Sequence, residues 1–147
     1  MRIYIASSWK NQHAVEMLTE NLELSGHEVV SFVREAKSTE KVLALKDKDA
    51  WIESESGEQK FSFDLDGACR SDLVIYIGPS GTDAWAEVGA AWASRVPIVG
   101  LWAKGEQAGL MRRMVLKWYA DYRELLGYVE GRQFRLNARQ AARATNA

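Results

Sequence analysis

Short apolar runs and one amphipathic segment organise the first part of the chain. The run at 3–6 ends in Ser7-Ser8 and has the length of a buried strand. Apolar residues then recur at steps of three and four over 14–22, which predicts a helix that ends at Ser25-Gly26. A second apolar run at 29–33 completes a β-α-β unit. A unit of about 30 residues favours a right-handed parallel crossover.

Uninterrupted apolar runs predict further strands in the second half of the chain. Runs without a polar position are typical of parallel strands that are covered by helices on both faces. Because strands alternate with helices, we expect a single doubly wound α/β sheet of the Rossmann-like class, with strand order 2-1-3-4-5. The expected elements are a short helix over 63–71, a strand over 73–77, a turn over 78–81, a helix over 84–93, a strand over 96–102, a helix over 107–117, and a short strand or helix within 119–130.

Two polar segments stand apart from this pattern. Residues 34–60 are rich in charge and lack a strand, and we expect a short helix around 39–51 whose Trp51 either anchors a lid or packs at the edge of the domain. We assign 1–130 to the domain and 131–147 to an Arg-rich C-terminal tail. In this tail Arg132, Arg135, Arg139 and Arg143 fall on one helical face, as a surface for an acidic partner would. A solvated or disordered tail is the favoured interpretation.

Composition narrows the range of functions. The 147 residues carry 19 Lys and Arg against 20 Asp and Glu, so the net charge of −1 gives no reason to expect a nucleic-acid or membrane-surface partner. The lone Cys69 excludes an internal disulfide and a multi-cysteine zinc site, and His13 and His27 are too far apart in sequence to suggest a metal site. No apolar run approaches the ~18–20 residues of a membrane span. We therefore expect a cytoplasmic protein without a metal.

The two loops that leave the first and third strands are the expected ligand site. In open α/β sheets a ligand binds beyond the carboxyl ends of the strands, where the strand order reverses. These loops are 7–12 and 78–83, and both lead into helices. Their Ser7, Ser8, Gly78, Ser80 and Gly81 suit a phosphate or a sugar hydroxyl, although such residues also serve as plain helix caps.

Glu87 is the sharpest candidate for chemistry, because its neighbours on the helix over 84–93 are all apolar or small. A carboxylate in apolar surroundings is costly unless it is paired or protonated, and such groups are candidate catalysts. The alternative is an exposed Glu87 or one that caps its own helix. Further carboxylates are expected near the same crevice. Asp72 comes just before a strand, at its far end from the site, and is expected to be a turn residue, whereas Asp83 is either a cap or a substrate contact. Two carboxylates beside one sugar carbon match glycosidic-bond chemistry. The carboxylates in question are Asp64, Asp66, Asp72 and Asp83.

These motifs together resemble the nucleoside 2-deoxyribosyltransferase family, which includes the deoxynucleoside 5′-monophosphate N-glycosidases. The resemblance covers residues 1 to about 104, and its most specific part is a Glu-x-Gly-x-Ala helix after a Gly-Thr turn. The segments that carry it are Ile3–Ser7, Asp64–Asp66, Ser71–Tyr76, Gly81–Ala91 and Pro97–Gly100.

The resemblance implies a flavodoxin-like fold and double displacement. In that scheme Glu87 is the nucleophile at C1′ of the sugar, Asp64 helps to protonate the leaving base, and Asp83 helps to hold the substrate. Tyr4 and Ser7 would contact sugar or base. The resemblance also implies a nucleoside or nucleotide substrate, no metal or organic cofactor, and a homo-oligomer. The aromatic run 118–122 either lends residues to a neighbouring chain's site or packs in the core.

Two other functions fit the same sequence features. A non-catalytic nucleotide sensor would use Glu87 to hold a ribose hydroxyl, and an NAD glycohydrolase would use it at the nicotinamide bond. Two departures from the family bear on specificity. The loop at 7–10 lacks the glycine-rich stretch of the monophosphate hydrolases, and Trp85 is bulkier than its counterpart in many relatives.

Overall fold

A five-stranded parallel sheet, in the order β2-β1-β3-β4-β5, forms the centre of the protein. The structure is a computed structural model that describes residues 1–35, 48–107 and 109–145. The expected fold class and strand order are confirmed. The strands are β1 (Arg2–Ala6), β2 (Glu28–Val30), β3 (Leu73–Ile77), β4 (Ile98–Leu101) and β5 (Lys117–Tyr119).

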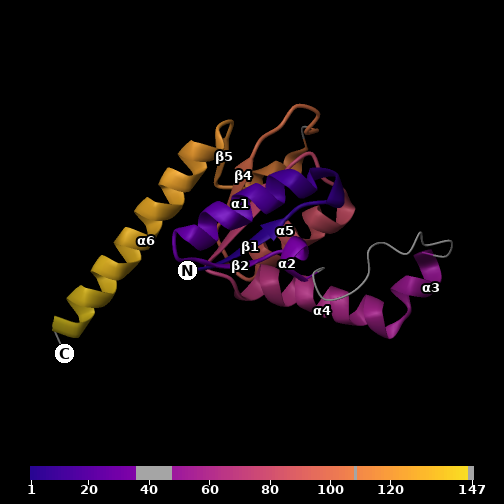
Figure 1. Ribbon diagram of the computed structural model, residues 1–147, viewed down its shortest axis with the longest axis horizontal. Coiled ribbons are helices and arrows are strands. Elements are labelled where there is room, and N and C mark those ends of the chain that lie inside the picture. Colours follow the sequence, from indigo (N-terminus) through magenta and orange to yellow (C-terminus); the bar gives the residue numbers. More distant parts are fainter. Residues whose placement is uncertain (36–47, 108, 146–147) are drawn as a thin grey trace.

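Helices cover both faces of the sheet (Figure 1). One face packs against α1 (Gln12–Leu24) and the start of α6 (Tyr122–Thr145), and the other packs against α4 (Glu55–Arg70) and α5 (Thr82–Ala93). Shorter elements are η1 (Trp9–Asn11), α2 (Phe32–Glu35), α3 (Lys48–Ile52) and η2 (Leu110–Met114). No helix in the described part of the chain has the length and apolar character that a membrane span requires.

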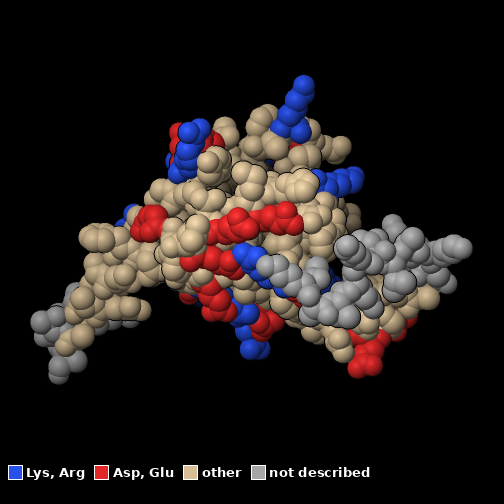
Figure 2. Space-filling view, in the orientation of Figure 1, with Lys and Arg blue, Asp and Glu red and all other residues tan. Residues whose placement is uncertain are grey.

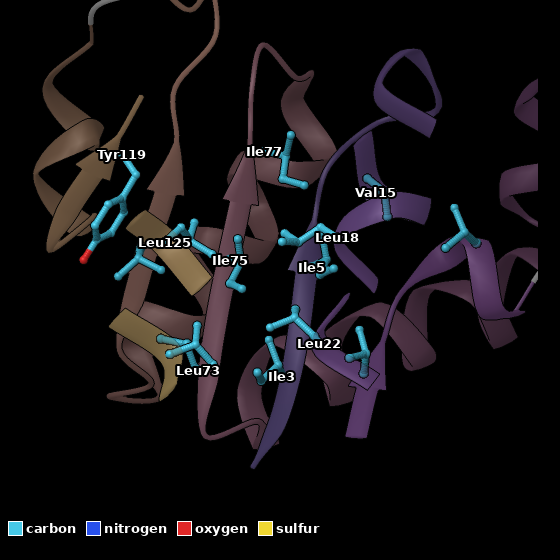
Figure 3. Packing of buried hydrophobic residues seen from close by; sticks show 14 of the residues in the cluster. Ile3, Ile5, Val15, Leu18, Leu22, Leu73, Ile75, Ile77, Tyr119 and Leu125 are labelled. Carbon is cyan, nitrogen blue, oxygen red and sulfur yellow. The ribbon is translucent and has the colours of Figure 1, made fainter. Parts of the chain in front are cut away.

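Alternation along the strands divides the core into two clusters. Successive side chains of a strand point to opposite faces, so Ile3 and Ile5 of β1 join the α1 side, whereas Tyr4 and Ala6 face α4 and α5. Figure 3 shows the α1 side, where buried aliphatic side chains from β1 and β3 meet those of α1 and Leu125 of α6. The α4 and α5 side is therefore the one that carries the functional candidates.

The structure corrects several expected boundaries. The strand expected over 29–33 ends at Val30, because the chain turns into α2. The helix expected over 63–71 begins at Glu55, where the Ser54 hydroxyl caps it by accepting from the Gly57 amide. The helix expected over 107–117 is wrong: the described residues there form the short η2 and then pair with β4 as β5.

Two further expectations concern the polar segments. The helix expected around 39–51 lies mostly outside the described residues, and half-buried Trp51 belongs to α3. The chain end is helical through Thr145, so the expected tail is not disordered, but most of its described side chains after 133 are exposed, in agreement with a solvated tail. Gln133 anchors this helix by accepting a hydrogen bond from the N-terminal amine of Met1 at 2.9 Å. Beyond that contact α6 extends away from the sheet (Figure 1).

Surface charge is mixed on the face that carries α1. Figure 2 shows acidic side chains gathered over α1, with basic side chains beside them. A nucleic-acid backbone is bound by a continuous basic surface. The face seen in Figure 2 carries no such surface, in agreement with the net charge of −1.

Gly67 lets α4 approach β1 closely. A Cβ at this position would lie 2.4 Å from the Tyr4 ring, so only glycine fits without displacing the tyrosine. We expect Gly67→Ala to lower the free energy of unfolding by about 1–3 kcal/mol, the usual cost of overpacking. Gly89→Ala is the matched control, because a Cβ on this α5 glycine meets nothing within 4 Å.

We expect Gly89→Ala to raise the free energy of unfolding by about 0.5–1 kcal/mol through helix propensity. Urea titrations of the two variants measure both effects. Equal effects of the two substitutions would contradict the close approach at Tyr4.

Candidate active site

Glu87 is buried where α5 crosses the sheet. It lies in the second turn of α5, which begins after Gly81, and retains 9% of its accessible surface. The expectation of an enclosed carboxyl is met, and an exposed Glu87 is excluded. Beneath it lies the ring of Tyr4, which β1 presents to this face. The Tyr4 hydroxyl also interacts with the Glu87 carboxyl, and each influences the pKa of the other.

A row of charged groups leads from Tyr4 to α2. The Tyr4 hydroxyl donates to Oδ1 of Asp64 at 3.1 Å. The same Oδ1 accepts from Nζ of Lys60, one helical turn earlier on α4. Lys60 Nζ also lies 3.5 Å from Oε2 of Glu35 at the end of α2. Four elements thus bring three carboxyls, one phenol and one ammonium together.

Burial and the nearby negative charge of Asp64 raise the pKa of the Glu87 carboxyl. Burial is the main cause and the Asp64 charge adds to it, so the pKa of Glu87 rises from 4.5 to about 8. The Tyr4 hydroxyl and the Lys60 charge oppose this rise in pKa, whereas Asp83 in the first turn of α5 adds to it. Burial also raises the pKa of the Tyr4 hydroxyl, which therefore keeps its proton and remains a donor.

Tyr4→Phe tests this interaction. The Tyr4 hydroxyl lowers the pKa of Glu87, so its removal is expected to raise that pKa. We expect the titration profile of the Glu87 carboxyl, followed by NMR, to move to higher pH. Tyr128→Phe, on α6 and away from Glu87, is the control. An unshifted profile in Tyr4→Phe would remove Tyr4 from the site.

The expected ligand loops are joined at the carboxyl edge of the sheet. The Ser7 hydroxyl donates to the Ile77 carbonyl at 2.8 Å, and the Asn11 amide donates to Ser7 and to the carbonyls of Ile77 and Pro79. Ser7 is therefore occupied in holding the two loops together. A ligand contact by Ser7 would have to replace or share this bond.

Ser8 and Ser80 have a different character. Each hydroxyl oxygen is buried and has no hydrogen-bond partner among the described residues. A buried polar atom without a partner is costly, and a bound ligand is one group that supplies the missing bond. Gly81 has open space around it, whereas a Cβ on Gly78 would lie 1.8 Å from Oε2 of Glu106, so a side chain at Gly78 would displace the Glu106 carboxylate.

The expected aromatic donors to a neighbouring chain lie in this chain's own core. Tyr119 is 3% exposed, and the Trp118 ring packs edge-on against Tyr76 with centroids 5.7 Å apart. The bulky Trp85 packs on Tyr76 at 4.7 Å. The Tyr76 hydroxyl donates to Glu106 at 2.9 Å. A core role is thus correct for Trp118 and Tyr119, while Tyr122 remains 44% exposed.

Two of the expected carboxylates serve the fold instead. Asp66 pairs with Arg2 at 2.9 Å and with Arg70, and Asp72 accepts from the Arg2 backbone amide at the opposite end of β1. The expectation that Asp66 lies near the ligand crevice is therefore wrong, whereas the expected turn role of Asp72, at the far end of its strand from the site, is confirmed. Within the described ranges no group of three or more His, Cys, Asp or Glu is placed to hold a metal ion. A hollow of about 550 Å³ lies away from Glu87, beside Trp92 and Val96.

Comparison with known proteins was made for the whole chain. No protein-family profile and no curated protein sequence matches it. Among solved structures, a 2-deoxyribosyltransferase from Bacillus psychrosaccharolyticus matches with a TM-score of 0.66 and 21% identity, covering 85% of this chain and 90% of that one. The chain has the 2-deoxyribosyltransferase fold. The structural resemblance expected from its motifs is thereby confirmed.

Two further structures share this 2-deoxyribosyltransferase fold. The Clostridium botulinum CMP N-glycosidase BcmB matches with a TM-score of 0.58 and 24% identity, covering 88% of this chain and 98% of that one. A conserved protein from Enterococcus faecalis V583 matches with a TM-score of 0.64 and 16% identity, covering 90% of this chain and 98% of that one. The fold thus accompanies proteins named for transfer and for cleavage at a glycosidic bond.

Sequence reasoning about this 2-deoxyribosyltransferase fold missed Lys60 and Glu35. Lys60 precedes Asp64 by four residues, the spacing that places two side chains on one helix face. This spacing was not recognised because the helix was expected to begin at 63, after Lys60. Glu35 was missed because the apolar residues at 29–33 were interpreted as a strand, whereas α2 begins at Phe32 and ends at Glu35.

Proposed function

We propose that the chain cleaves or transfers at the N-glycosidic bond of deoxynucleosides, nucleosides or nucleotides through a covalent glycosyl-Glu87 intermediate. The observation that carries this proposal is the buried Glu87 carboxyl held against Tyr4, with Asp64 bonded to the same hydroxyl. A buried carboxyl with a perturbed pKa, oriented by a neighbour, is the arrangement that a covalent glycosyl nucleophile needs. The proposal includes a cytoplasmic homo-oligomer that takes a small-molecule substrate.

The proposed reaction has two displacements. In the first, an oxygen of ionised Glu87 bonds to C1′, the C1′–N bond breaks, and its electron pair leaves with the base, which takes up a proton. In the second, water or a nitrogen of another base bonds to C1′, gives up a proton, and frees the Glu87 carboxylate. The Tyr4 hydroxyl, which interacts with Glu87 and donates to Asp64, holds the two carboxyls beside each other in both steps. The resemblance assigns Asp64 to help with the proton and Asp83 to hold the substrate.

The test is incubation of the protein with a panel of nucleosides, nucleotides and NAD. We expect free base from at least one nucleoside or nucleotide, and a mass increase of one glycosyl group on the peptide that contains Glu87 after acid quenching. Tight binding of a nucleotide without base release would instead indicate a sensor. Release of nicotinamide alone would indicate an NAD glycohydrolase. If no base is released and no adduct forms with any substrate of the panel, the proposal is refuted.

A further inference from the structure

The end of α6, residues 134–145, leads away from the domain. The domain holds this helix as far as Gln133, whose side chain accepts from the N-terminal amine, and Arg132 donates to the Asp72 carbonyl at 3.4 Å. Beyond these contacts α6 extends away from the sheet (Figure 1), and its Phe134 is 74% exposed. Isolated helices shorter than ~12–15 residues are marginal in water, because packing supplies most helical stability in proteins. We therefore expect the end of α6 to pack on another molecule.

An apolar strip and a basic strip run side by side along the end of α6. Phe134 and Ala138 are one helical turn apart. Arg135 and Arg139 each follow one of them directly, so the two strips are adjacent. All four side chains are exposed. Phe134 is bulky, whereas Ala138 leaves room for a second helix, and a membrane surface would need a broader apolar face. This surface suits a helix that exposes apolar and acidic side chains together.

The exposed face of α1 has that character. Met17, Glu20 and Leu24 are spaced three and four residues apart, so they lie on one side of the helix. Although both are apolar, Met17 is 61% exposed and Leu24 is 89% exposed. A hollow of about 390 Å³ is lined by Glu20, Glu23 and Leu24. Figure 2 shows acidic side chains gathered over this helix. The face thus offers a place for an apolar side chain with carboxylates around it.

Charge is divided between the two parts of the chain as such a contact requires. Residues 1–130 carry 15 Lys and Arg against 20 Asp and Glu, a net charge of −5, whereas residues 131–147 carry four Arg and no acid, a net charge of +4. Beside α1, Arg34 of α2 pairs with Glu23 and so balances one carboxylate, while Glu20 adds to the negative surface. The acidic domain therefore attracts the basic helix end of a second copy and repels the phosphates of a nucleic acid.

We propose that the end of α6 binds the exposed face of α1 in a second copy of this chain. Phe134 packs against the apolar side chains of that face, and Arg135 and Arg139 pair with its carboxylates. Because each copy carries both surfaces, two copies exchange their helices reciprocally, and such a pair closes on itself. This inference rests on the homo-oligomer of the proposed function and gives it an interface. Helix α1 covers the face of the sheet opposite to Glu87, so the contact is separate from the proposed reaction.

Paired charge reversals test this contact. Arg135→Glu with Arg139→Glu reverses the basic strip, and Glu20→Arg with Glu23→Arg reverses the acidic face. We expect light scattering and sedimentation to show the parent at twice the mass of the chain. Each reversed protein alone is expected to dissociate, with its Kd raised about 100-fold or more, because like charges then meet. An equimolar mixture of the two reversed proteins is expected to regain the double mass, since each reversed surface meets an opposite one.

Controls separate the contact from general effects of charge. Glu58→Lys on α4 and Lys104→Glu after β4 reverse exposed charges elsewhere, and both proteins are expected to keep the double mass. Thermal unfolding of each variant shows that it is folded, and recovery in the mixture shows that the reversed surfaces themselves are intact. Base release is measured in parallel and reports on the proposed reaction alone.

Three results would overturn the interface. They are a parent protein that is monomeric at micromolar concentrations, a dimer whose Kd neither reversal changes, and a mixture of reversed proteins that stays monomeric. Capture of a nucleic acid or of a different acidic protein by the end of α6 in a monomeric parent would assign the helix to that partner and likewise overturn the proposal. Absence of base release in a protein that passes the mass tests refutes the proposed reaction and leaves the interface supported.

Discussion

Replacement of Glu87 by glutamine is expected to abolish base release. The amide has nearly the same size and keeps the contact with Tyr4, but it cannot bond to C1′ as a carboxylate does. We expect kcat to fall by about a thousandfold or more, which corresponds to ~4 kcal/mol of transition-state stabilisation. The measurement is steady-state release of base from the substrate that the panel identifies, together with the intact mass of the quenched protein.

We expect the variant to remain folded, which thermal unfolding checks. Glu20→Gln, an exposed carboxyl on α1, is the matched control and retains full activity. In Glu87→Gln the glycosyl adduct is also absent, since no other side chain replaces the nucleophile. Base release by Glu87→Gln at the parental rate would eliminate covalent catalysis by this residue.

The same substitution is expected to stabilise the protein in alkaline solution. The pKa of Glu87 is about 8 in the folded chain against 4.5 for an ordinary glutamate, so between these values the folded state binds a proton that the unfolded state has released. The free energy of unfolding of the parent therefore falls as pH rises through this window and levels off above about 8. Glutamine has no such proton, so the variant escapes this loss.

Urea titrations of the parent and of Glu87→Gln near pH 5 and near pH 9 measure this effect. Their difference in unfolding free energy is expected to be small near pH 5 and to favour the variant by on the order of 3 kcal/mol near pH 9. Other titrating groups contribute equally to both proteins and cancel in the difference. A difference that does not change with pH would mean that Glu87 titrates normally, and the argument from its burial would fail.

Much of the fold follows from local patterns. Strands β1 and β3 can be predicted from their own residues, because burial on both faces requires an uninterrupted apolar run. Helix α1 can be predicted in the same way, because its apolar residues recur at helical spacing. Residues 117–119 show the opposite case. They form the edge strand β5 by pairing with β4, and their own residues do not predict this long-range contact. The same limit explains the helix wrongly expected over 107–117.

Some residues of the site could also be predicted from the sequence, whereas others could not. Glu87 was recognisable from sequence because one carboxylate among apolar residues conflicts with its surroundings, and Asp64 and Tyr4 were recognisable through the motifs around them. Whether these groups touch depends on the parallel register of β1 with β3 and on the close approach of α4 at Gly67. Lys60 and Glu35 join them only through packing between α2 and α4.

The sequence by itself therefore determined the α/β class, the strand order and the residue with the most costly burial. Those properties depend on hydrophobic spacing and on the desolvation of single groups. Only the tertiary structure decided which charges surround Glu87, and so both the rise in its pKa and the row that ends at Glu35. Electrostatic interactions depend on distances across elements, which residues far apart in sequence acquire only when the chain folds.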